Sequence, residues 1–373
     1  MTLKQELVRT QEMEINFGPH HPSTHGVFRA VFTLDGEYIT KCVNHLGYLH
    51  RGIEKLAESR TYTQFIPYNG RLDYVSGMLN ESAYVQAVEE LMGIADQIPE
   101  RAQYIRVIMC ELQRIASHLV FWASMALDMG GFTPWTYGFR ERDTVLDLFE
   151  MAAGNRMMPN YMRIGGVAAD LNEEFMPALR KFLDIMPKAL EEYHGILTGN
   201  EIFQARTIGV APLSAETALD YGISGPIARA SGIDYDMRRD EPYGIYDRFK
   251  FNVPVRKNGD TFDRYMVRLD EMAESVKILE QAYRDIPEGP VMAKVPKVIK
   301  PPAGEVFYRI EHSKGHFGFH IVSDGSNKPY RLRIYSPCFT NVAIFEEMAK
   351  GLHLQDAVVA FASLDIILGE IDR

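Results

Sequence analysis

Three histidines lie within one short loop near the start of the chain. His20, His21 and His25 occur in Gly18-Pro-His-His-Pro-Ser-Thr-His-Gly26, where two prolines and two glycines exclude a helix. The loop contains no cysteine or acid, so it lacks the further ligands that a zinc site needs. Two interpretations remain open. Either the imidazoles bond to backbone groups, or a rigid loop presents His25 to a ligand that gains or loses protons, since imidazole titrates near neutral pH.

Two acids stand where a carboxylate could serve proton chemistry. Asp73 and Tyr74 lie at the head of a predicted helix, a position where an aspartate also interacts favourably with the helix dipole. Asp128 ends an apolar run, Val120–Leu127. Its carboxylate is either solvated at a helix end or buried against a partner, and the pattern alone does not choose between the two.

A second histidine group, His312, His316 and His320, repeats every four residues. On a helix these side chains would share one face and could ligate a metal. Gly315 and Gly318 interrupt the run, and the residues between them alternate as in a strand. We therefore predict strands joined by a turn and no metal site.

The cysteines offer no alternative metal site. Cys42, Cys110 and Cys338 include no CxxC pair, so this chain cannot by itself supply the four thiolates of an iron–sulfur cluster or an all-cysteine zinc site. An odd, sparse set of cysteines is also unlike a secreted disulfide framework. We expect the chain to bind no metal itself.

Composition narrows the classes of function. The 373 residues include 40 basic and 50 acidic residues, a net charge of −10, which argues against nucleic acid as the main ligand. The longest apolar stretches, Ile115–Leu127 and Ala357–Ile371, are each interrupted by a polar residue and fall short of the ~20 residues that span a bilayer. Met1–Asn16 has no apolar core and carries three acids, so we expect no signal or transit peptide. If the protein functions at a membrane, we therefore expect it to lie peripherally and to be held there by partner proteins.

The elements that must position these residues can be predicted from periodicity. Asp35-Gly36 between two β-rich runs predicts a hairpin over residues 27–43, and Gly304 is preceded by a proline-rich segment typical of an extended strap. Three-to-four-residue apolar spacing predicts helices, and Pro177 and Pro187 are expected to kink or split one of them. The predicted helices cover Arg71–Gln97, a ~30-residue span from Pro99 to Gly130, Glu141–Ala153, Glu173–Leu197, Thr261–Asp285 and Leu354–Leu368.

These elements predict an α+β fold, in which a central bundle of long helices is flanked by β-containing regions at both ends. We expect an N-terminal β-containing region with the histidine loop at 1–60, a helical core at 61–285, a proline-rich linker at 286–304 and a C-terminal β-plus-helix region at 305–373.

Six segments in order carry a resemblance to a known family. Together they resemble the 49-kDa subunit of respiratory complex I, which in bacteria is the D subunit of the proton-pumping NADH–quinone oxidoreductase. The segments are Gly18–Gly26, His45–Lys55, Phe139–Arg142, Arg163–Val167, Val322–Gly325 and Leu368–Arg373.

That family is similar in turn to the large subunit of nickel–iron hydrogenases, so the resemblance implies a hydrogenase-like fold. On the spacing of the hydrogenase cysteine motifs this sequence carries Asp73, Ser76, Ile367 and Glu370 in place of the four thiolates. Without these soft ligands a nickel–iron centre cannot be held. The resemblance therefore implies an ancestral metal pocket that now serves another redox partner.

By resemblance, that partner is a quinone, either menaquinone or ubiquinone. The family implies that His25 and Tyr74 donate hydrogen bonds to the quinone head group and that Asp128 pairs with His25. It implies that electrons come from a [4Fe–4S] cluster held by a neighbouring subunit, with Arg71 close to that cluster. Met158 occupies a position where many family members carry a histidine beside the cluster.

The resemblance also implies a place in a larger assembly. The expected partners are the cluster-bearing B subunit, the C subunit and, in the membrane arm, the H and A subunits. The expected location is peripheral, on the cytoplasmic side of the cell inner membrane. Three alternatives stay open: the equivalent subunit of a ferredoxin- or deazaflavin-dependent membrane oxidoreductase, a soluble nickel–iron hydrogenase, which the missing cysteines oppose, and a structural scaffold, which the pairing of His25 with Tyr74 opposes.

Overall fold

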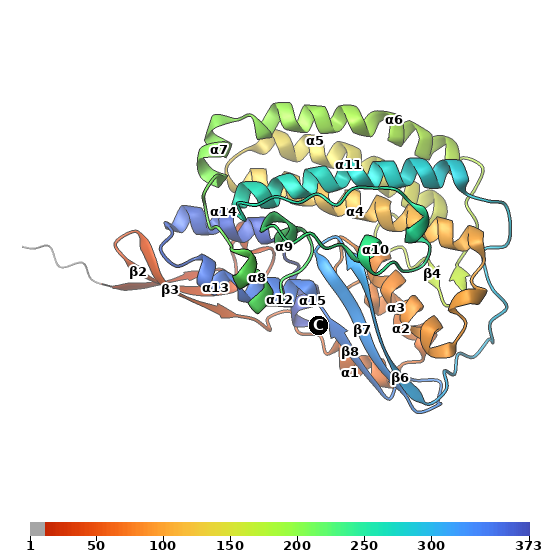
Figure 1. Ribbon diagram of the computed structural model, residues 1–373. Helices are drawn as coiled ribbons and strands as arrows, with labels where there is room; N and C mark the ends of the chain where they lie inside the picture. The colour runs from red at the N-terminus through yellow and green to blue at the C-terminus, as the bar shows by residue number, and fades with distance from the viewer. Residues whose placement is uncertain (1–11) are drawn as a thin grey trace, which may run out of the picture.

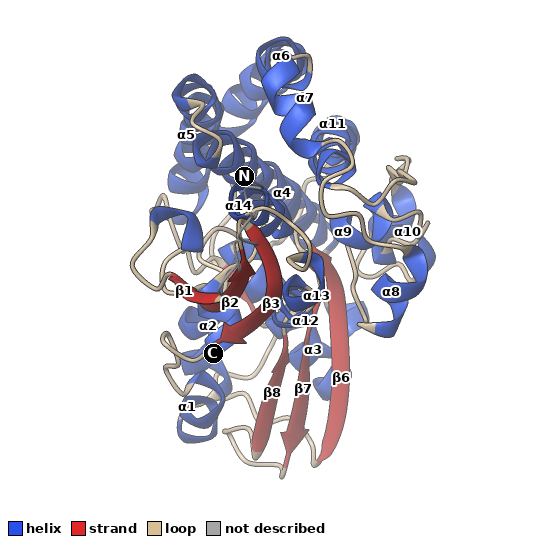
Figure 2. Cartoon of the chain, turned by 90° about the vertical axis from the view of Figure 1, so that its left-hand side faces the viewer, coloured by secondary structure: helices blue, strands red, loops and turns tan. Residues whose placement is uncertain are grey.

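A computed structural model describes residues 12–373. The first part of the predicted N-terminal region, residues 1–11, and most of the segment considered for a signal peptide therefore lie outside the described residues. The structure is mixed α and β, as predicted: four long helices form a bundle, and two three-stranded antiparallel sheets lie on the same side of it (Figures 1 and 2).

The N-terminal sheet has the strand order β1-β2-β3. Its strands are β1 (Met13–Phe17), β2 (Arg29–Asp35) and β3 (Tyr38–His45). Gly36, at φ 63°, makes the turn between β2 and β3, a backbone conformation that glycine adopts without strain. The hairpin predicted from Asp35-Gly36 is confirmed, and the histidine loop is the connection from β1 to β2.

The long helices provide most of the core. They are α4 (Glu100–Asp128), α5 (Phe132–Ala153), α6 (Phe175–Tyr193) and α11 (Thr261–Asp285). The bounds of α11 agree with the prediction, and α4 has 29 residues, close to the expected length. α5 begins earlier than predicted. α6 continues through Pro187, so the expected split is wrong.

The start of the third helix corrects a prediction that matters for the site. The helix predicted over Arg71–Gln97 is only α3 (Gly77–Met92). The Asn80 side chain donates to the carbonyl oxygens of Asn69 and Asp73, each at 3.0 Å. Because this amide satisfies backbone groups that a helix would otherwise pair, the residues before Gly77 form a turn.

The C-terminal sheet confirms the strand assignment of the second histidine group. Its strands, in the order β6-β7-β8, are β6 (Gly304–His312), β7 (Gly315–Ser323) and β8 (Arg331–Tyr335). His312 pairs with Gly315 across the β6–β7 turn, while His316 and His320 lie along β7. The three side chains therefore do not share a helical face.

The end of the chain differs from the single helix predicted over Leu354–Leu368. The structure has α14 (Leu354–Leu364) and α15 (Leu368–Asp372). Asp365 between them adopts the left-handed conformation, with φ 53°, which ends α14. An aspartate tolerates this conformation better than most residues. The spacing of apolar residues does not reveal the break, so the sequence predicted one continuous helix.

Short elements complete the fold and join its layers. The helices are α1 (Ile53–Ser59), α2 (Tyr62–Asn69), α7 (Glu201–Thr207), α8 (Ala215–Asp220), α9 (Pro226–Ala230), α10 (Met237–Asp240), α12 (Pro337–Ala343) and α13 (Phe345–Met348), and the two-residue strands are β4 (Met162–Arg163) and β5 (Gly166–Val167). One apolar cluster joins α3, α4, α5, α6, α11 and the C-terminal sheet, and a second joins the N-terminal sheet to α12–α15. Among the described residues, no helix is both long and apolar enough to cross a membrane.

Candidate functional site

The histidine loop is held by its own side chains. Residues Pro22–Thr24 form one turn of 3-10 helix. The His21 ring nitrogen Nδ1 accepts a hydrogen bond from the Ser23 amide at 3.2 Å, and the Thr24 hydroxyl donates to the His21 carbonyl at 2.6 Å. His25 follows in the left-handed conformation, with φ 51°. The first interpretation of the loop therefore holds for His21, and the turn fixes the position of His25.

The hydrogen bond of His25 decides what its other nitrogen can do. Its Nδ1 lies 3.1 Å from the carbonyl oxygen of Ile366, and a carbonyl can only accept, so Nδ1 carries the hydrogen. The ring packs edge-on against Phe361, with centroids 5.4 Å apart. Among residues 12–373, Nε2 has no hydrogen-bond partner. A neutral His25 therefore offers an acceptor at Nε2, whereas the imidazolium offers a donor.

Asp128 is the last residue of α4 and faces the histidine loop. Burial raises the pKa of its carboxyl, while a contact with the Ser23 side chain and the charges of His25 and His21 oppose that rise. Within the described residues His25 bonds to Ile366, and its interaction with Asp128 is through charge at longer range.

Tyr74 lies in the turn between α2 and α3. The Asp73 carboxylate accepts from the Val75 amide at 2.9 Å, and the Gln113 side chain donates to the Val75 carbonyl at 2.6 Å. The Tyr74 ring is partly exposed, and burial, followed by the charge of Asp73, raises the pKa of its phenol. The phenol is thus a protonated donor near neutral pH.

The α14–α15 segment, residues 365–369, comprises the link between the two helices and the start of α15, and it contacts both loops. Ile366 accepts the hydrogen bond from His25. Three residues later, a Cβ at Gly369 would lie 2.5 Å from the carbonyl oxygen of Leu72 and 3.4 Å from that of Arg71. The His25 loop and the Tyr74 turn therefore meet the same short C-terminal segment, although they are far apart in sequence.

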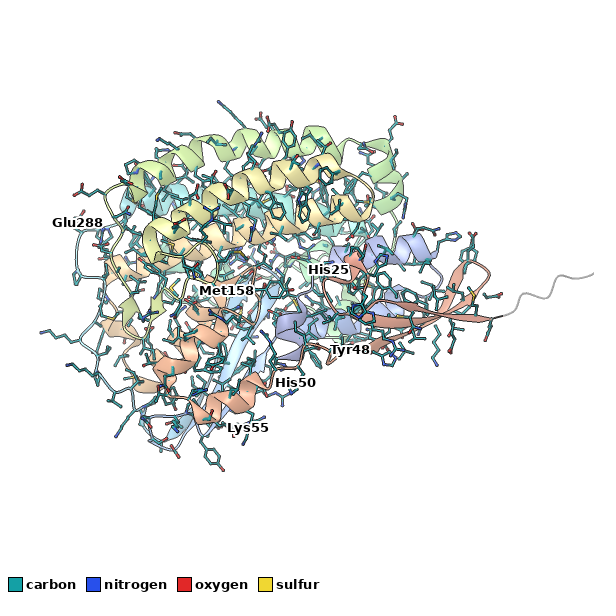
Figure 3. The ribbon with its side chains drawn as sticks, turned by 180° about the vertical axis from the view of Figure 1, so that it is seen from behind. His25, Tyr48, His50, Lys55, Met158 and Glu288 are labelled. Atoms are coloured by element: carbon teal, nitrogen blue, oxygen red, sulfur yellow. The ribbon has the colours of Figure 1, made fainter. Side chains whose placement is uncertain are left out.

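Met158 and Arg71 lie beside the same turn. A Cβ at Gly77 would be 3.7 Å from the Met158 Cα, which places Met158 against the start of α3. The Arg71 side chain is exposed and donates to the Pro67 carbonyl at 2.6 Å. Met158 and His25 both lie below the long helices on the face shown in Figure 3.

Comparisons with known proteins identify the family. Residues 128–373 match the family described as "Respiratory-chain NADH dehydrogenase, 49 Kd subunit". A relative from Clostridium beijerinckii, named as the D subunit of NADH-quinone oxidoreductase, is 64% identical over 366 residues, 98% of each chain. Proteins of the same name from Desulfitobacterium hafniense and Desulforamulus reducens are 57% and 55% identical over 98% of this chain and 98% and 99% of their own lengths.

The chain belongs to the 49-kDa subunit family of complex I. In bacterial terms it is a D subunit of NADH–quinone oxidoreductase. The resemblance stated from the motifs is thereby confirmed, and the relatives align along nearly the whole chain.

A buried polar cluster lies beside the Asp73-Tyr74 turn. Asp73 and Glu370 approach His312 so that one ligand atom of each lies within 4.8 Å of the others. Ser76 shares a hydrogen bond of 2.8 Å with Ser313. Asp73, Ser76 and Glu370 are three of the four positions that the resemblance aligned with the hydrogenase cysteines.

Sequence patterns did not single out Lys314, although it lies in this cluster. Ser313-Lys314-Gly315 has the composition of an exposed turn, yet Lys314 is 1% exposed. Its ammonium lies 3.2 Å from the Asp73 carboxylate and 3.5 Å from that of Asp365. No local signal reveals this burial, because it depends on α4 and α15 covering the β6–β7 turn.

A large surface hollow lies elsewhere. It has a volume of about 650 Å³ and is lined by residues of α3, α4, β6 and the segment around Tyr243. Neither His25 nor Tyr74 lines it. The chemistry-bearing residues lie instead at a partly exposed surface of the chain, so size alone does not identify the site.

Proposed function

We propose that this protein forms the quinone-reduction site of its proton-pumping complex, together with the neighbouring subunit that carries the terminal [4Fe–4S] cluster. The observation that carries the proposal is the meeting of the His25 loop and the Tyr74 turn on the α14–α15 segment. His25 bonds to this segment, and the segment packs against the backbone just before Tyr74. Both residues are partly exposed, while Nε2 of His25 is buried.

The chemistry of quinone reduction requires two such groups. Conversion of a quinone to a quinol takes up two electrons and two protons, and negative charge develops on two ring oxygens. The Tyr74 phenol is a donor in its ordinary state. His25 donates from Nε2 only as the imidazolium, since Nδ1 is committed to Ile366. We infer that the charge of Asp128 keeps His25 in that donating form.

This arrangement suggests how reduction is coupled to pumping. When His25 gives its proton to the quinone, Asp128 loses the positive charge that it faces. The carboxylate is then free to change partners. We propose this local charge change as the signal that the membrane arm receives.

Electron delivery is assigned to the surface around Arg71 and Met158. The cluster held by the neighbouring B subunit would supply single electrons, and the Arg71 cation would favour its reduced form. Methionine neither takes up a proton nor donates a strong hydrogen bond. A low, nearly pH-independent cluster potential follows, which in turn favours a low-potential menaquinone as the acceptor.

The partners and the location follow from the same assignment. The histidine loop and Met158 would face the cluster-bearing B subunit, with the C subunit on the peripheral arm and the H and A subunits at the membrane. The chain would sit peripherally on the cytoplasmic side of the inner membrane, where the head group of a lipid-soluble quinone can reach His25 and Tyr74.

Substitutions in the assembled complex test the site. We expect His25→Ala and Tyr74→Phe each to lower NADH–quinone turnover by about 10²-fold, because general acid catalysis contributes at least that much. Transfer from NADH to a water-soluble artificial acceptor should stay normal, since that route precedes this protein. His20→Ala, in the same loop, and Tyr68→Phe, near the same turn, are the matched controls.

Asp128→Asn tests the coupling step in the same preparations. We expect it to lower quinone turnover by about tenfold, equivalent to about 1.4 kcal/mol of lost imidazolium stabilisation, and to lower the protons pumped per quinol in reconstituted vesicles. Unchanged turnover and unchanged pumping in this variant would remove Asp128 from the mechanism. Unchanged turnover in both His25→Ala and Tyr74→Phe would contradict the proposed site as a whole.

A further inference from the structure

Four ionisable residues form a fully buried cluster that the proposed reaction does not use. Asp73 comes from the turn before α3, His312 and Lys314 from the β6–β7 turn, and Glu370 from α15. None is more than 1% exposed. One ligand atom from each of Asp73, His312 and Glu370 lies within 4.8 Å of the other two.

Several buried acceptor atoms of this cluster lack a hydrogen-bond donor, and an extra proton would supply one. Glu370 Oε1 accepts from the Ser336 hydroxyl at 2.7 Å and the Cys338 amide at 2.9 Å, but its Oε2 has no partner among the described residues. Asp73 Oδ2 and both ring nitrogens of His312 likewise accept and donate no hydrogen bond there. Lone pairs facing one another in a buried space require a hydrogen between them.

Lys314 does not provide that hydrogen to Glu370. Its ammonium donates to the Ser117 hydroxyl at 2.7 Å and lies 3.2 Å from Asp73 and 3.5 Å from Asp365. The ammonium therefore faces Ser117 and the two aspartates. His312 Nε2 lies 3.9 Å from Asp73 Oδ2, too far for a hydrogen bond, and no described group donates to Glu370 Oε2.

We propose that Glu370 holds a buried, exchangeable proton, which passes through Asp73 to Tyr74 after the Tyr74 phenol has protonated the quinone. This inference rests on the proposed quinone site and names the source of one of its protons. The step moves a proton only: the Glu370 carboxylic acid becomes a carboxylate, the Tyr74 phenolate becomes a phenol, and no electron is transferred. Water from outside restores the proton on Glu370 between turnovers.

The charges around the cluster favour a bound proton over a bound metal ion. Burial, followed by the negative charge of Asp73, raises the pKa of Glu370 to about 7. Burial lowers the pKa of His312 to about 3, so that ring stays neutral. The Lys314 ammonium, 3.2 Å from Asp73, would repel a divalent cation bound to the same carboxylate.

Several charged or titratable groups face the cluster from the elements packed around it. Their charges act on Glu370 together with its burial. From the surrounding elements these groups are Asp73 and Tyr74 before α3, Arg114 and His118 on α4, Arg268 on α11, His312 and Lys314 in the β6–β7 turn, Cys338 on α12, and Asp365 before α15.

Asp73 and Tyr74 are linked through charge. Burial first, and then the charge of the preceding residue Asp73, raise the pKa of the Tyr74 phenol. A phenolate formed at Tyr74 would therefore be a strong base beside Asp73. This ordering drives the proton from Glu370 toward Tyr74.

Infrared difference spectroscopy on the assembled complex tests the proposal. The unmodified complex should show a protonated-carboxyl band that disappears on quinone reduction and titrates with a midpoint near pH 7. Glu370→Gln should remove this band and slow single-turnover quinol formation by about tenfold. Glu81→Gln is the matched control, since Glu81 is also buried, also has a pKa raised to about 7 and lies outside the cluster.

The outcomes separate this proposal from the quinone site itself. Persistence of the reduction-linked band in Glu370→Gln, or its absence from the unmodified complex, would overturn the proposal while leaving the effects of His25→Ala and Tyr74→Phe intact. A bound metal that elemental analysis finds beyond the cluster iron, and that Glu370→Gln removes, would overturn it as well. If Glu370→Gln does not assemble, Glu81→Gln still tests the assignment. The reduction-linked band should persist in Glu81→Gln, and its loss there would overturn the proposal.

Discussion

At the scale of single residues, the most informative contact is the hydrogen bond between His25 and the Ile366 carbonyl, 3.1 Å long. It assigns the hydrogen of the neutral ring to Nδ1 and makes protonation the condition for donation from Nε2. The sequence predicted His25 as a group that exchanges protons. It could not predict the tautomer, because the partner lies 341 residues away and is a backbone atom.

Met158 allows a prediction at the same scale. Met158→His should make the midpoint potential of the neighbouring cluster higher and pH-dependent, since an imidazole beside it can take up a proton on reduction. The expected slope is about 59 mV per pH unit, the value for one electron and one proton. Redox titration of the cluster by EPR at several pH values measures it, with Met157→His as the control.

A redox titration of the unmodified complex could contradict the prediction for Met158. A slope of about 59 mV per pH unit already present with Met158 in place would show that another group near the cluster carries the proton. The assignment of pH-independence to this methionine would then be wrong.

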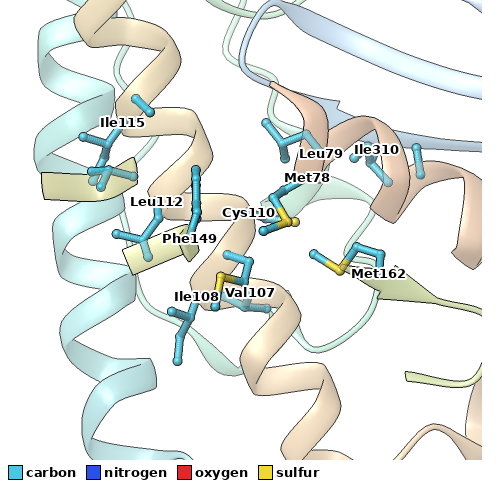
Figure 4. Packing of buried hydrophobic residues seen from close by; sticks show 14 of the residues in the cluster. Met78, Leu79, Val107, Ile108, Cys110, Leu112, Ile115, Phe149, Met162 and Ile310 are labelled. Atoms are coloured by element: carbon cyan, nitrogen blue, oxygen red, sulfur yellow. The ribbon is translucent and has the colours of Figure 1, made fainter. Parts of the chain in front are cut away.

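At the scale of elements, long periodic helices were predictable and polar turns were not. The core of α4 packs Cys110 and Leu112 among apolar residues such as Met78 and Met162 (Figure 4), and this repeating burial is what periodicity detects. The turn before α3 and the break at Asp365 arise from contacts made across the fold. Both breaks lie at the candidate site, a place where local helix preference is expected to fail as a predictor.

Gly369 tests whether the α14–α15 segment positions the two loops. In Gly369→Ala the new Cβ would meet the Leu72 carbonyl at 2.5 Å, so the segment must move away from the Tyr74 turn. We expect a stability loss of about 1–3 kcal/mol and a fall in quinone turnover of up to about 10²-fold, since small displacements of a reacting geometry cost that much.

The control for this substitution is Gly195→Ala, where the added Cβ meets nothing within 4 Å. Steady-state kinetics on complexes of matched cluster content measures both variants. Normal turnover in Gly369→Ala, with the same loss of stability, would show that the close approach matters for folding and not for the site.

At the scale of the whole molecule, a network of buried charges connects the helical layer to the C-terminal sheet. Arg229 donates to Glu271 of α11 at 2.6 Å and to Glu311 of β6 at 2.9 Å, and Glu271 also contacts His118 of α4 at 2.9 Å. All four residues are fully buried. Residues from widely separated segments meet here, so sequence patterns gave no sign of the network.

Removal of Arg229 should therefore destabilise the protein. Arg229→Met leaves Glu271 and Glu311 buried without their guanidinium, and we expect a loss of about 3–5 kcal/mol. Arg239→Met, at a partly exposed arginine with two aspartate partners, should cost at most about 1 kcal/mol. The yield of assembled complex and its thermal unfolding midpoint measure both, and equal effects would contradict the argument.

The same network gives stability a defined pH dependence. Arg229 and His118 lower the pKa of the Glu271 carboxyl against the effect of burial. A carboxyl whose pKa is lower in the folded state stabilises the fold above its unfolded pKa, and that stability is lost as the pH falls through the folded value. Acid should therefore weaken the junction between the helical layer and the C-terminal sheet.

The central claim is that His25 and Tyr74 together grip one quinone head group. A cryo-EM map of the assembled complex with a short-tailed quinone bound tests it most directly. We expect one ring oxygen within about 3 Å of His25 Nε2 and the other within about 3 Å of the Tyr74 hydroxyl. Head-group density at another place in the complex, or two side chains too far apart for one ring to bridge, would contradict the account.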